Sequence, residues 1–401
     1  MRGAVDLDTA RSLVKATCRP LEVETVAVRD AVGHTLARDV TAAEPVPSAD
    51  VAAMDGICVR ADRLDARGPA IRVAGEMPAG QVAALPEGCA IGISTGAALP
   101  PGADTVIRRE RFEWIGEHHR EARVTSAVPR GSDVRRAGED FQVGQGVLAA
   151  GRRIDARALG ALIAAGVRVV ETRRPPRVAV LTTGDEVRGD VGSLGPGEVR
   201  DVSLPALGEL ASGLGASWVY GAHVRDRPRE LADQLARACA AADLVVVAGG
   251  LGPGPHDHSA RAWRTACVQT VFERVRVRPG RPTRCGVSAA GTAILGVPGN
   301  PGAAFVMMLV LGIGALAGLR CEAVPERWTL PLDRAVERRT GDTRLLRCGL
   351  AGQRAVVLAA QGAHQVSSLP YTALVAELAP GPGAAPAGSA VPCVMYPSGV
   401  G

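Results

Sequence analysis

The chain has 401 residues, of which 47% are hydrophobic and only 3% aromatic, so it has apolar material for several small cores but few rings for a nucleic-acid stacking platform. The net charge of +5 comes from 46 basic and 41 acidic residues spread along the chain, which excludes a charged tail. Nine widely spaced cysteines without a C-x-x-C pair argue against a zinc or redox site and predict reduced thiols in a cytoplasmic protein.

The first half of the chain predicts a discontinuous unit that is interrupted by a β-rich insertion. Residues 7–42 form two short amphipathic stretches around an extended segment. From 45 to 142, short β-rich pieces alternate with Pro and Gly turns. These pieces lie at 56–59, 71–74, 90–94, 105–108 and 121–126. Residues 143–170 return to a helical pattern, so we expect the chain to re-enter its first subdomain there.

The second half predicts an α/β domain followed by a small β domain. Apolar strands alternate with amphipathic helices, which indicates a parallel, doubly wound sheet. Strands are expected at 177–183, 217–224, 243–250, 271–277 and 292–297, and helices near 203–214, 228–241 and 301–318. The apolar run 303–319 is interpreted as a buried helix and not as a membrane span. The predicted subdomains are 1–44 with 143–173, 45–142, 174–322 and 323–401.

The segment TTGDE at 182–186 carries the first candidate site. It directly follows a predicted strand, and ligands of doubly wound sheets bind at the carboxyl ends of the strands. Asp185 and Glu186 therefore point to a site for a hard cation such as magnesium, or to base chemistry on a bound group. Capping of a helix by Asp185 is the competing interpretation.

The glycine-rich segment GGLGPGPHD follows the next strand of the α/β pattern. Gly249 and Gly250 allow backbone N–H groups to approach a phosphate closely, while Asp257 reaches inward. His256 and His258 have no third ligand near them in sequence and are interpreted as solvated loop residues. The segment lacks the G-x-G-x-x-G spacing of a dinucleotide site, which argues against a nucleotide-dependent oxidoreductase.

Two further segments present groups that attract anions. Pro298 and Pro301 in PGNP frame the expected N-terminus of a helix, unless the segment is a plain strand-to-helix turn. Arg274, Arg278 and Arg281 bracket a strand end and are candidates to hold the oxygens of an oxyanion. A solvated basic face competes with this interpretation, since a further arginine lies among them.

Taken in order, these loops resemble those of the molybdopterin molybdenumtransferase family, which includes the bacterial MoeA proteins and the E domain of gephyrin. The resemblance covers nearly the whole chain. It rests on EPVPSADVAAMDG, TGAALPPGAD, RRAGEDF, TTGDEV, GGLGPGPHD, RPGRP, GVPGNP and QGAHQVSSL. Seven or more loops in family order are far more specific than any one of them.

The resemblance implies an elongated homodimer of four subdomains, the third of which has a molybdopterin-binding fold. It also implies a transferase that takes molybdate and adenylylated molybdopterin, cleaves the adenylate in a magnesium-dependent step and releases molybdenum cofactor and AMP. The active site would lie between the third subdomain of one protomer and the second of its partner. Molybdoenzymes or proteins of the cofactor pathway are compatible partners, whereas nucleic acid and membrane are not expected.

The matching residues are assigned position by position. The catalytic candidates are the acidic residues Asp55, Asp140, Glu186, Asp226 and Asp257. The binding candidates that the family's motifs add are Thr95 and Arg135, together with the loop prolines Pro298 and Pro301. Arg274, Arg278 and Arg281 stand where the family usually has lysine, and arginine binds oxyanions through a wider fork.

Several polar positions depart from the family's pattern, namely Val51, Ala52, Ser203, Arg227, Gly252 and Pro255. Each lost hydrogen bond is worth roughly 0.5–1.5 kcal/mol, so their combined loss would weaken ligand affinity or alter specificity. These departures motivate an alternative function, a divergent paralogue with weak or no catalysis that binds partners as a gephyrin-like scaffold.

Overall fold

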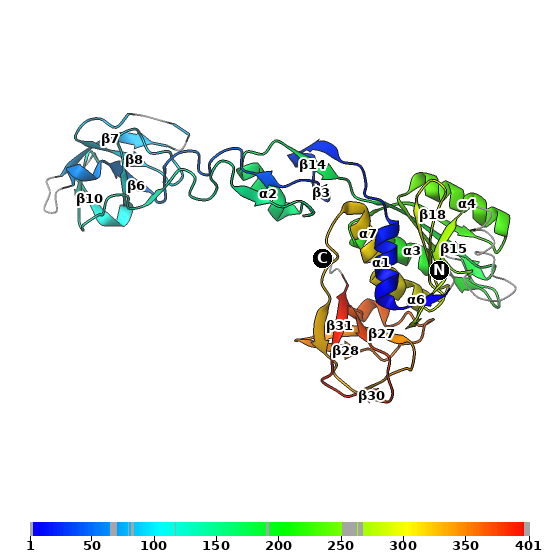
Figure 1. Cartoon of the computed structure of the whole chain (residues 1–401). Coiled ribbons are helices and arrows are strands. Elements are labelled where there is room, and N and C mark those ends of the chain that lie inside the picture. Colours follow the sequence, from blue (N-terminus) through cyan, green and yellow to red (C-terminus); the bar gives the residue numbers. More distant parts are fainter. Residues whose placement is uncertain are drawn as a thin grey trace.

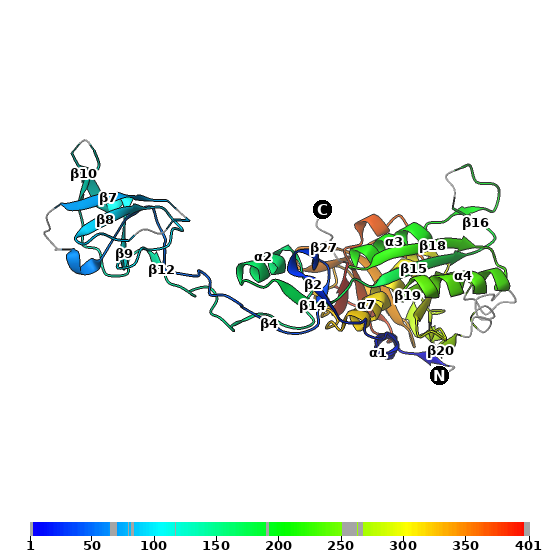
Figure 2. The ribbon, with the colours of Figure 1, turned by 90° about the horizontal axis from the view of Figure 1, so that it is seen from above.

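The computed structural model describes residues 3–64, 70–78, 80–81, 84–116, 118–189, 192–250, 263 and 268–396. The molecule is elongated, with a small β unit at one end, a thin arm in the middle and two larger units at the other end (Figure 1). Figure 2, seen from above, shows the same separation between the small unit and the larger ones.

The small unit is a six-stranded sheet, here called the insertion sheet, with the order β10-β11-β7-β8-β6-β9. Its strands are β6 Gly56–Val59, β7 Ile71–Met77, β8 Cys89–Ile93, β9 Thr105–Arg108, β10 Phe112–Ile115 and β11 Glu121–Val124. Alternate side chains of β6 enter opposite clusters, since Ile57 and Val59 pack on one face and Cys58 on the other. All five β pieces predicted from the sequence are observed, and β10 is an additional strand.

The arm is built by pairing segments that are far apart in the sequence. Its elements are β2 Glu24–Ala27, β3 Thr35–Leu36, β4 Val40–Thr41, β5 Val51–Ala52, β12 Val134–Arg135, β13 Gly146–Leu148, α2 Ala156–Ala164 and β14 Val169–Arg173. The outgoing strands β4 and β5 pair with the returning strands β13 and β12. At the base, β14 lies between β2 and β3, so the chain returns to its first segment as expected. The exact subdomain limits stay a prediction.

The central sheet has the strand order β18-β15-β19-β24-β23-β20. Its strands are β15 Arg177–Thr183, β18 Ser217–Val224, β19 Leu244–Ala248, β20 Gln269–Phe272, β23 Arg284–Val287 and β24 Ala293–Val297. The first four strands are parallel, whereas β23 is antiparallel to both of its neighbours, β24 and β20. Helices α1 Leu7–Thr17, α3 Ser203–Gly213, α6 Pro301–Met307 and α7 Ile313–Arg320 share one core cluster with the sheet, and α4 Pro228–Ala241 covers the other face.

The single strand predicted at 271–277 is wrong. The chain divides there into β20, β21 (Arg274–Val275) and β22 (Val277–Arg278), which pair with three different strands. β21 pairs with β1 (Ala4–Val5), and β22 leaves the central sheet to pair with β27 of the C-terminal sheet. An apolar alternation predicts an extended backbone, but it does not specify the partner strand.

The helix at 301–320 is the one described helix that is long and apolar enough to cross a membrane, with a mean hydropathy of 2.2, yet 94% of its apolar window is buried inside the protein. It consists of α6, a π-helical turn over Met308–Gly312 and α7. Its side chains belong to the largest core cluster, beside the strands of the central sheet. The predicted buried helix is confirmed.

The C-terminal sheet has the order β22-β27-β29-β31-β25, with β28 paired to β27. Its remaining strands are β25 Trp328–Pro331, β27 Thr343–Ala351, β28 Arg354–Val357, β29 Leu374–Leu378 and β31 Ala390–Met395. Leu345, Val375 and Val394 belong to the core cluster of the central sheet, whereas Leu346 and Ala376 form a separate cluster. One face of this sheet therefore packs against the α/β unit, which fixes how the two units meet.

A charged joint ties the arm to the α/β unit. Glu322, after α7, forms ion pairs with Arg153 at 3.2 Å and Arg320 at 2.9 Å, and it accepts a hydrogen bond from the Thr35 hydroxyl at 2.6 Å. Arg320 also donates to the carbonyl oxygen of Leu214 at 3.2 Å. Because its donors come from both units, the Glu322 carboxylate holds the direction in which the arm leaves.

Candidate active site

The segments that follow the four parallel strands meet at one edge of the central sheet. Strands β15, β18, β19 and β24 end at Thr183, Val224, Ala248 and Val297. Gly249 donates its backbone N–H to the carbonyl oxygen of Val297 at 3.1 Å. Its φ is +104°, and a Cβ there would lie 2.7 Å from the Thr183 hydroxyl oxygen. Only glycine fits such a close approach, so the loops converge as the sequence predicts.

The Asp185-Glu186 corner lies at this edge with both residues exposed. Asp185 accepts a hydrogen bond from the backbone N–H of Asp226 at 3.2 Å, which joins the loops after β15 and β18. The corner is followed by β16 (Val187–Arg188), so helix capping by Asp185 is wrong. The backbone carbonyl oxygen of Glu186 accepts a hydrogen bond from the N–H of Val199 at 2.9 Å. This bond fixes the backbone of the turn, and no described residue holds the Glu186 carboxylate.

Metal binding at this corner rests on Asp185 and Glu186. Among the described residues, no three His, Cys, Asp or Glu side chains gather in a way that would hold a metal ion by themselves. Magnesium commonly takes only one or two protein carboxylates and completes its octahedron with water and substrate phosphates. Two exposed neighbouring carboxylates therefore suit a magnesium ion that arrives with a phosphorylated substrate. Asp257, with His256 and His258, lies outside the described residues.

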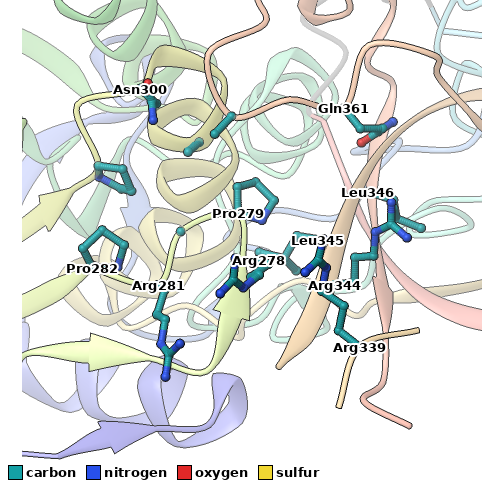
Figure 3. Close-up of a pocket in the computed structure, with 14 residues that line it drawn as sticks. Arg278, Pro279, Arg281, Pro282, Asn300, Arg339, Arg344, Leu345, Leu346 and Gln361 are labelled. Atoms are coloured by element: carbon teal, nitrogen blue, oxygen red, sulfur yellow. The ribbon is translucent and has the colours of Figure 1, made fainter. Parts of the chain in front are cut away.

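Arginines from two units line a cavity of about 390 Å³ beside the carboxyl end of β24. Arg278 lies on β22, and Arg281 follows it on the turn after that strand. Arg339 lies in the loop after β26 (Val336–Glu337), and Arg344 lies on β27. Figure 3 shows Arg278, Arg339 and Arg344 gathered on one side, with Arg281 on the turn that borders the cavity. The remaining lining residues are Pro279, Gly280, Pro282, Pro298, Asn300, Ala303, Leu345, Leu346, Gln361 and Ala363.

The ladder between β22 and β27 places two positive charges side by side. Arg278 and Arg344 are register partners in this parallel pair, and like charges directly opposite one another on a sheet repel. Arg278 is compensated by Asp342, whose carboxylate lies 3.2 Å from its Nε, whereas Arg344 donates to the Glu337 carbonyl oxygen at 2.7 Å. Burial and the nearby charge of Arg339 lower the pKa of Arg344.

The N-terminus of a helix adds to the positive potential of this cavity. Pro298 lines the wall and Pro301 is the first residue of α6, whose N-terminal turn begins at Asn300. A helix N-terminus carries a partial positive charge and favours anions. The PGNP segment is thus both a tight turn and part of the cavity. Arg274 is not among the cavity residues, because β21 pairs it with Ala4 instead.

A buried arginine supports this wall from behind. Arg347 is 1% exposed, and one of its terminal nitrogens donates to the carbonyl oxygens of Ala360 at 2.6 Å and Gly362 at 2.9 Å. Its other terminal nitrogen lies beside Gly302, where a Cβ would be only 2.2 Å away. Burial without an acidic partner lowers its pKa. Gly302 therefore allows the first turn of α6 to contact the C-terminal sheet.

The candidate residues of the first half lie at the far end of the same chain. Asp55 accepts hydrogen bonds from the backbone N–H of Thr95 at 2.6 Å and from its hydroxyl at 2.8 Å, and these bonds lower the pKa of the Asp55 carboxyl. Arg135 lies on β12 opposite Val51, and Asp140 is exposed shortly after it. The insertion sheet and the central sheet occupy opposite ends of the molecule (Figure 1), so one chain does not bring Asp55 and Glu186 together.

The positions that depart from the family's pattern have different environments. Ala52 is buried in β5 next to Val51, and Ser203 is the buried first residue of α3. Arg227 is exposed at the N-cap of α4 and makes no side-chain capping bond. Gly252 and Pro255 lie outside the described residues. None of the four described positions contributes a polar side chain to the arginine cavity.

Sequence reasoning missed Arg339, in the loop before β27, and Arg344, on β27 itself. They stand in the charged run ERRTGDTR, and this run is the only signal that the sequence offers for them. Thr183 was also missed. Its hydroxyl is buried at the sheet edge and has no hydrogen-bond partner within the described chain.

Comparison with known proteins assigns the two halves to related families. Residues 5–166 match the MoeA N-terminal region (domain I and II), and residues 179–318 match a probable molybdopterin binding domain. A molybdopterin molybdenumtransferase of Nostoc sp. is 32% identical over 310 residues, which cover 74% of this chain and 70% of that protein. Molybdopterin molybdenumtransferase 2 of Mycobacterium tuberculosis is 32% identical and covers 76% of both chains.

Solved structures agree with this assignment. A crystal structure of the molybdopterin biosynthesis MoeA protein of Pyrococcus horikoshii superposes with a TM-score of 0.80 at 27% identity, covering 98% of this chain and 99% of that one. A crystal structure of a molybdopterin biosynthesis MoeA protein from Pyrococcus horikoshii OT3 gives a TM-score of 0.81 at 23% identity and shows the shared fold. The order of loops, the fold and these relatives lead to one conclusion: the chain belongs to the molybdopterin molybdenumtransferase family.

Proposed function

We propose that the protein is a transferase of molybdenum cofactor biosynthesis that inserts molybdate into adenylylated molybdopterin and releases AMP in a magnesium-dependent reaction. The observation that carries the proposal is the cavity at the carboxyl end of β24, in which Arg278, Arg339 and Arg344 converge with one compensating carboxylate. A site with this surplus of positive charge suits a tetrahedral dianion.

The arginine cavity would bind the oxyanion, and the acidic corner would receive the phosphorylated end of the pterin. Arg344 and Arg278 would hold molybdate oxygens through charge-assisted hydrogen bonds, while the N-terminus of α6 adds a partial positive charge. Asp185 and Glu186 would hold magnesium, which neutralises phosphate charge when bound. Asp226 supports this corner through its N–H bond to Asp185, and Gly249 lets the segment after β19 approach Thr183 closely.

The second half of the site would come from another copy of the chain. Asp55, Thr95, Arg135 and Asp140 lie at the opposite end of the molecule from Glu186, so they can join it only from a partner. The Asp55 carboxylate is exposed and held in one orientation by Thr95, which suits a group that completes a neighbouring pocket. A homodimer with two composite sites follows from this arrangement.

The described cysteines are all free, which fits the expected cytoplasmic location. The alternative function as a catalytically weak scaffold has no support among the relatives described above, which are named as transferases.

The decisive experiment incubates the purified protein with adenylylated molybdopterin, molybdate and magnesium and measures AMP by chromatography. We expect AMP and metal-loaded cofactor from the wild type, and loss of both in Glu186→Ala, which removes one carboxylate of the corner. Absence of AMP from wild-type protein that is folded and dimeric would sink the proposal. Tungstate in place of molybdate tests how strictly the cavity discriminates between oxyanions of the same shape and charge.

A further inference from the structure

A hydrogen-bonded chain of three side chains lies at the carboxyl edge of the central sheet, on the side covered by α3. The Thr182 hydroxyl donates to Oδ2 of Asp201, and Nδ1 of His223 lies 3.2 Å from the same hydroxyl oxygen. Thr182 and His223 are register partners on the parallel strands β15 and β18. The ladder itself therefore holds the imidazole next to the hydroxyl.

The buried carboxylate of Asp201 fixes the direction of these hydrogen bonds. Its side chain is 2% exposed, and its second oxygen accepts the backbone N–H of Leu204 at 2.9 Å in the first turn of α3. Both carboxylate oxygens are thus acceptors, and the helix N-terminus favours their charge. A hydroxyl has one proton to donate, and Thr182 gives it to Asp201. The Thr182 oxygen must then accept from His223.

This order of donors specifies the tautomer of the imidazole. Nδ1 of His223 carries the proton, so in the neutral ring Nε2 keeps a free lone pair. The side chain is 21% exposed, and no described residue forms a hydrogen bond with Nε2. A histidine with a purely structural role in the core would have both nitrogens satisfied. Here one nitrogen is fixed by the protein and the other is left open to solvent.

The open nitrogen lies at the same sheet edge as the acidic corner. His223 precedes Asp226 by three residues, and the N–H of Asp226 binds the Asp185 carboxylate at 3.2 Å. The arginine cavity and the N-terminus of α6 lie beside the carboxyl end of β24, so the Nε2 lone pair adds a neutral acceptor at the β18 end of the same sheet edge. A substrate that fits this edge would place its own N–H or O–H group toward His223.

We propose that His223 is a substrate-binding residue whose Nε2 accepts a hydrogen bond from an N–H or O–H group of adenylylated molybdopterin, with Asp201 setting the tautomer through Thr182. This inference rests on the proposed transferase function. Donors of this kind occur on both the pterin ring and the ribose, so the test includes molybdopterin alone and AMP alone as separate ligands. The ligand whose affinity depends on His223 identifies the donor.

The first measurement is the tautomer in the wild-type protein, by long-range ¹⁵N–¹H NMR of histidine-labelled protein, with His223→Gln to assign the signal. We expect an unprotonated Nε2 near pH 8, and a change in its nitrogen shift when adenylylated molybdopterin is added. A protonated Nε2 in the free protein, or a shift that the ligand leaves unchanged, would overturn the proposal.

The second measurement is ligand affinity by calorimetry in His223→Ala, Thr182→Val and the matched control His118→Ala on the insertion. Loss of one hydrogen bond predicts binding weakened by roughly 2- to 13-fold in His223→Ala. We expect a smaller loss in Thr182→Val and none in the control. Equal affinity in all variants, with an active wild type, would overturn this inference alone. A wild type that neither binds nor cleaves adenylylated molybdopterin would overturn the proposed function as well.

Discussion

Substitution of Arg344 by glutamine is expected to weaken oxyanion binding without weakening the fold. Arg344 lines the cavity and has no carboxylate within ion-pair distance in the described structure, so its charge is available to a ligand. A hydrogen bond to a charged group contributes about 1.5–3 kcal/mol. Its loss predicts a Kd for molybdate that rises roughly 10- to 150-fold.

The stability of the Arg344→Gln variant should change little, because two effects oppose each other. The bond to the Glu337 carbonyl oxygen is lost, which destabilises by roughly 0.5–1.5 kcal/mol. Repulsion from Arg278 and Arg339 is relieved, which stabilises by about 0.2–1 kcal/mol. The free energy of unfolding should therefore stay within about 1 kcal/mol of the wild type.

Calorimetric titration with molybdate at two salt concentrations measures the first effect, and urea unfolding measures the second. Arg354→Gln is the matched control, since Arg354 is an exposed arginine on β28 of the same sheet and does not line the cavity. Equal molybdate affinity in both variants would refute the reasoning. So would a large loss of stability specific to Arg344→Gln, because Arg344 would then be a structural residue.

Three further predictions concern the fold and the assembly. Gly302→Ala places a Cβ 2.2 Å from the buried Arg347 and 2.7 Å from the Gln365 carbonyl oxygen, so the free energy of unfolding should fall by roughly 1–3 kcal/mol. The control Gly160→Ala, on the open face of α2, should raise the free energy of unfolding. Burial raises the pKa of Glu322, but Arg153, Arg320 and Thr35 lower it more. Because folding lowers this pKa, the Glu322 carboxylate stabilises the fold above the ordinary pKa of 4.5, and this stabilisation is lost as the pH falls below that value. The difference in free energy of unfolding between the wild type and Glu322→Gln should therefore shrink as the pH is lowered. A difference that stays constant with pH would contradict this sign. Mixing Asp55→Asn with Glu186→Gln under conditions of subunit exchange should restore about a quarter of the composite sites, measured as AMP release, and no recovery would argue against a shared site.

Much of the fold follows from local patterns in the sequence. The pieces at 56–59 and 105–108 are observed with the predicted limits, and the apolar run after Pro301 is a buried helix. These elements were predictable because their periodicity and turn residues act over a few positions. The prediction of a single strand at 271–277 failed for the opposite reason, since the three short strands found there pair with strands from other parts of the chain.

The candidate site divides in the same way. Asp185, Gly249 and Pro298 were predictable because carboxyl ends of parallel strands share one edge. Arg344 was not predictable, because it reaches Arg278 through a strand pairing between positions 66 residues apart, and no local sequence pattern indicates that pairing. Arg274 was predicted as a binding residue because it is close in sequence to Arg278, but β21 pairs it with Ala4, away from the cavity.

The separate hydrophobic clusters of the insertion sheet have a consequence for how such proteins diverge. Among the described residues, those that fill this sheet share no cluster with those of the central sheet, and the thin arm with its charged joint connects the two. The insertion can thus accumulate changes as an interchangeable module without disturbing the other core. If the proposed composite site forms, swapping the insertion for the module of a relative would replace one wall of the pocket and leave the opposite wall native. Substrate choice would then depend on the pairing between modules and not on either one alone.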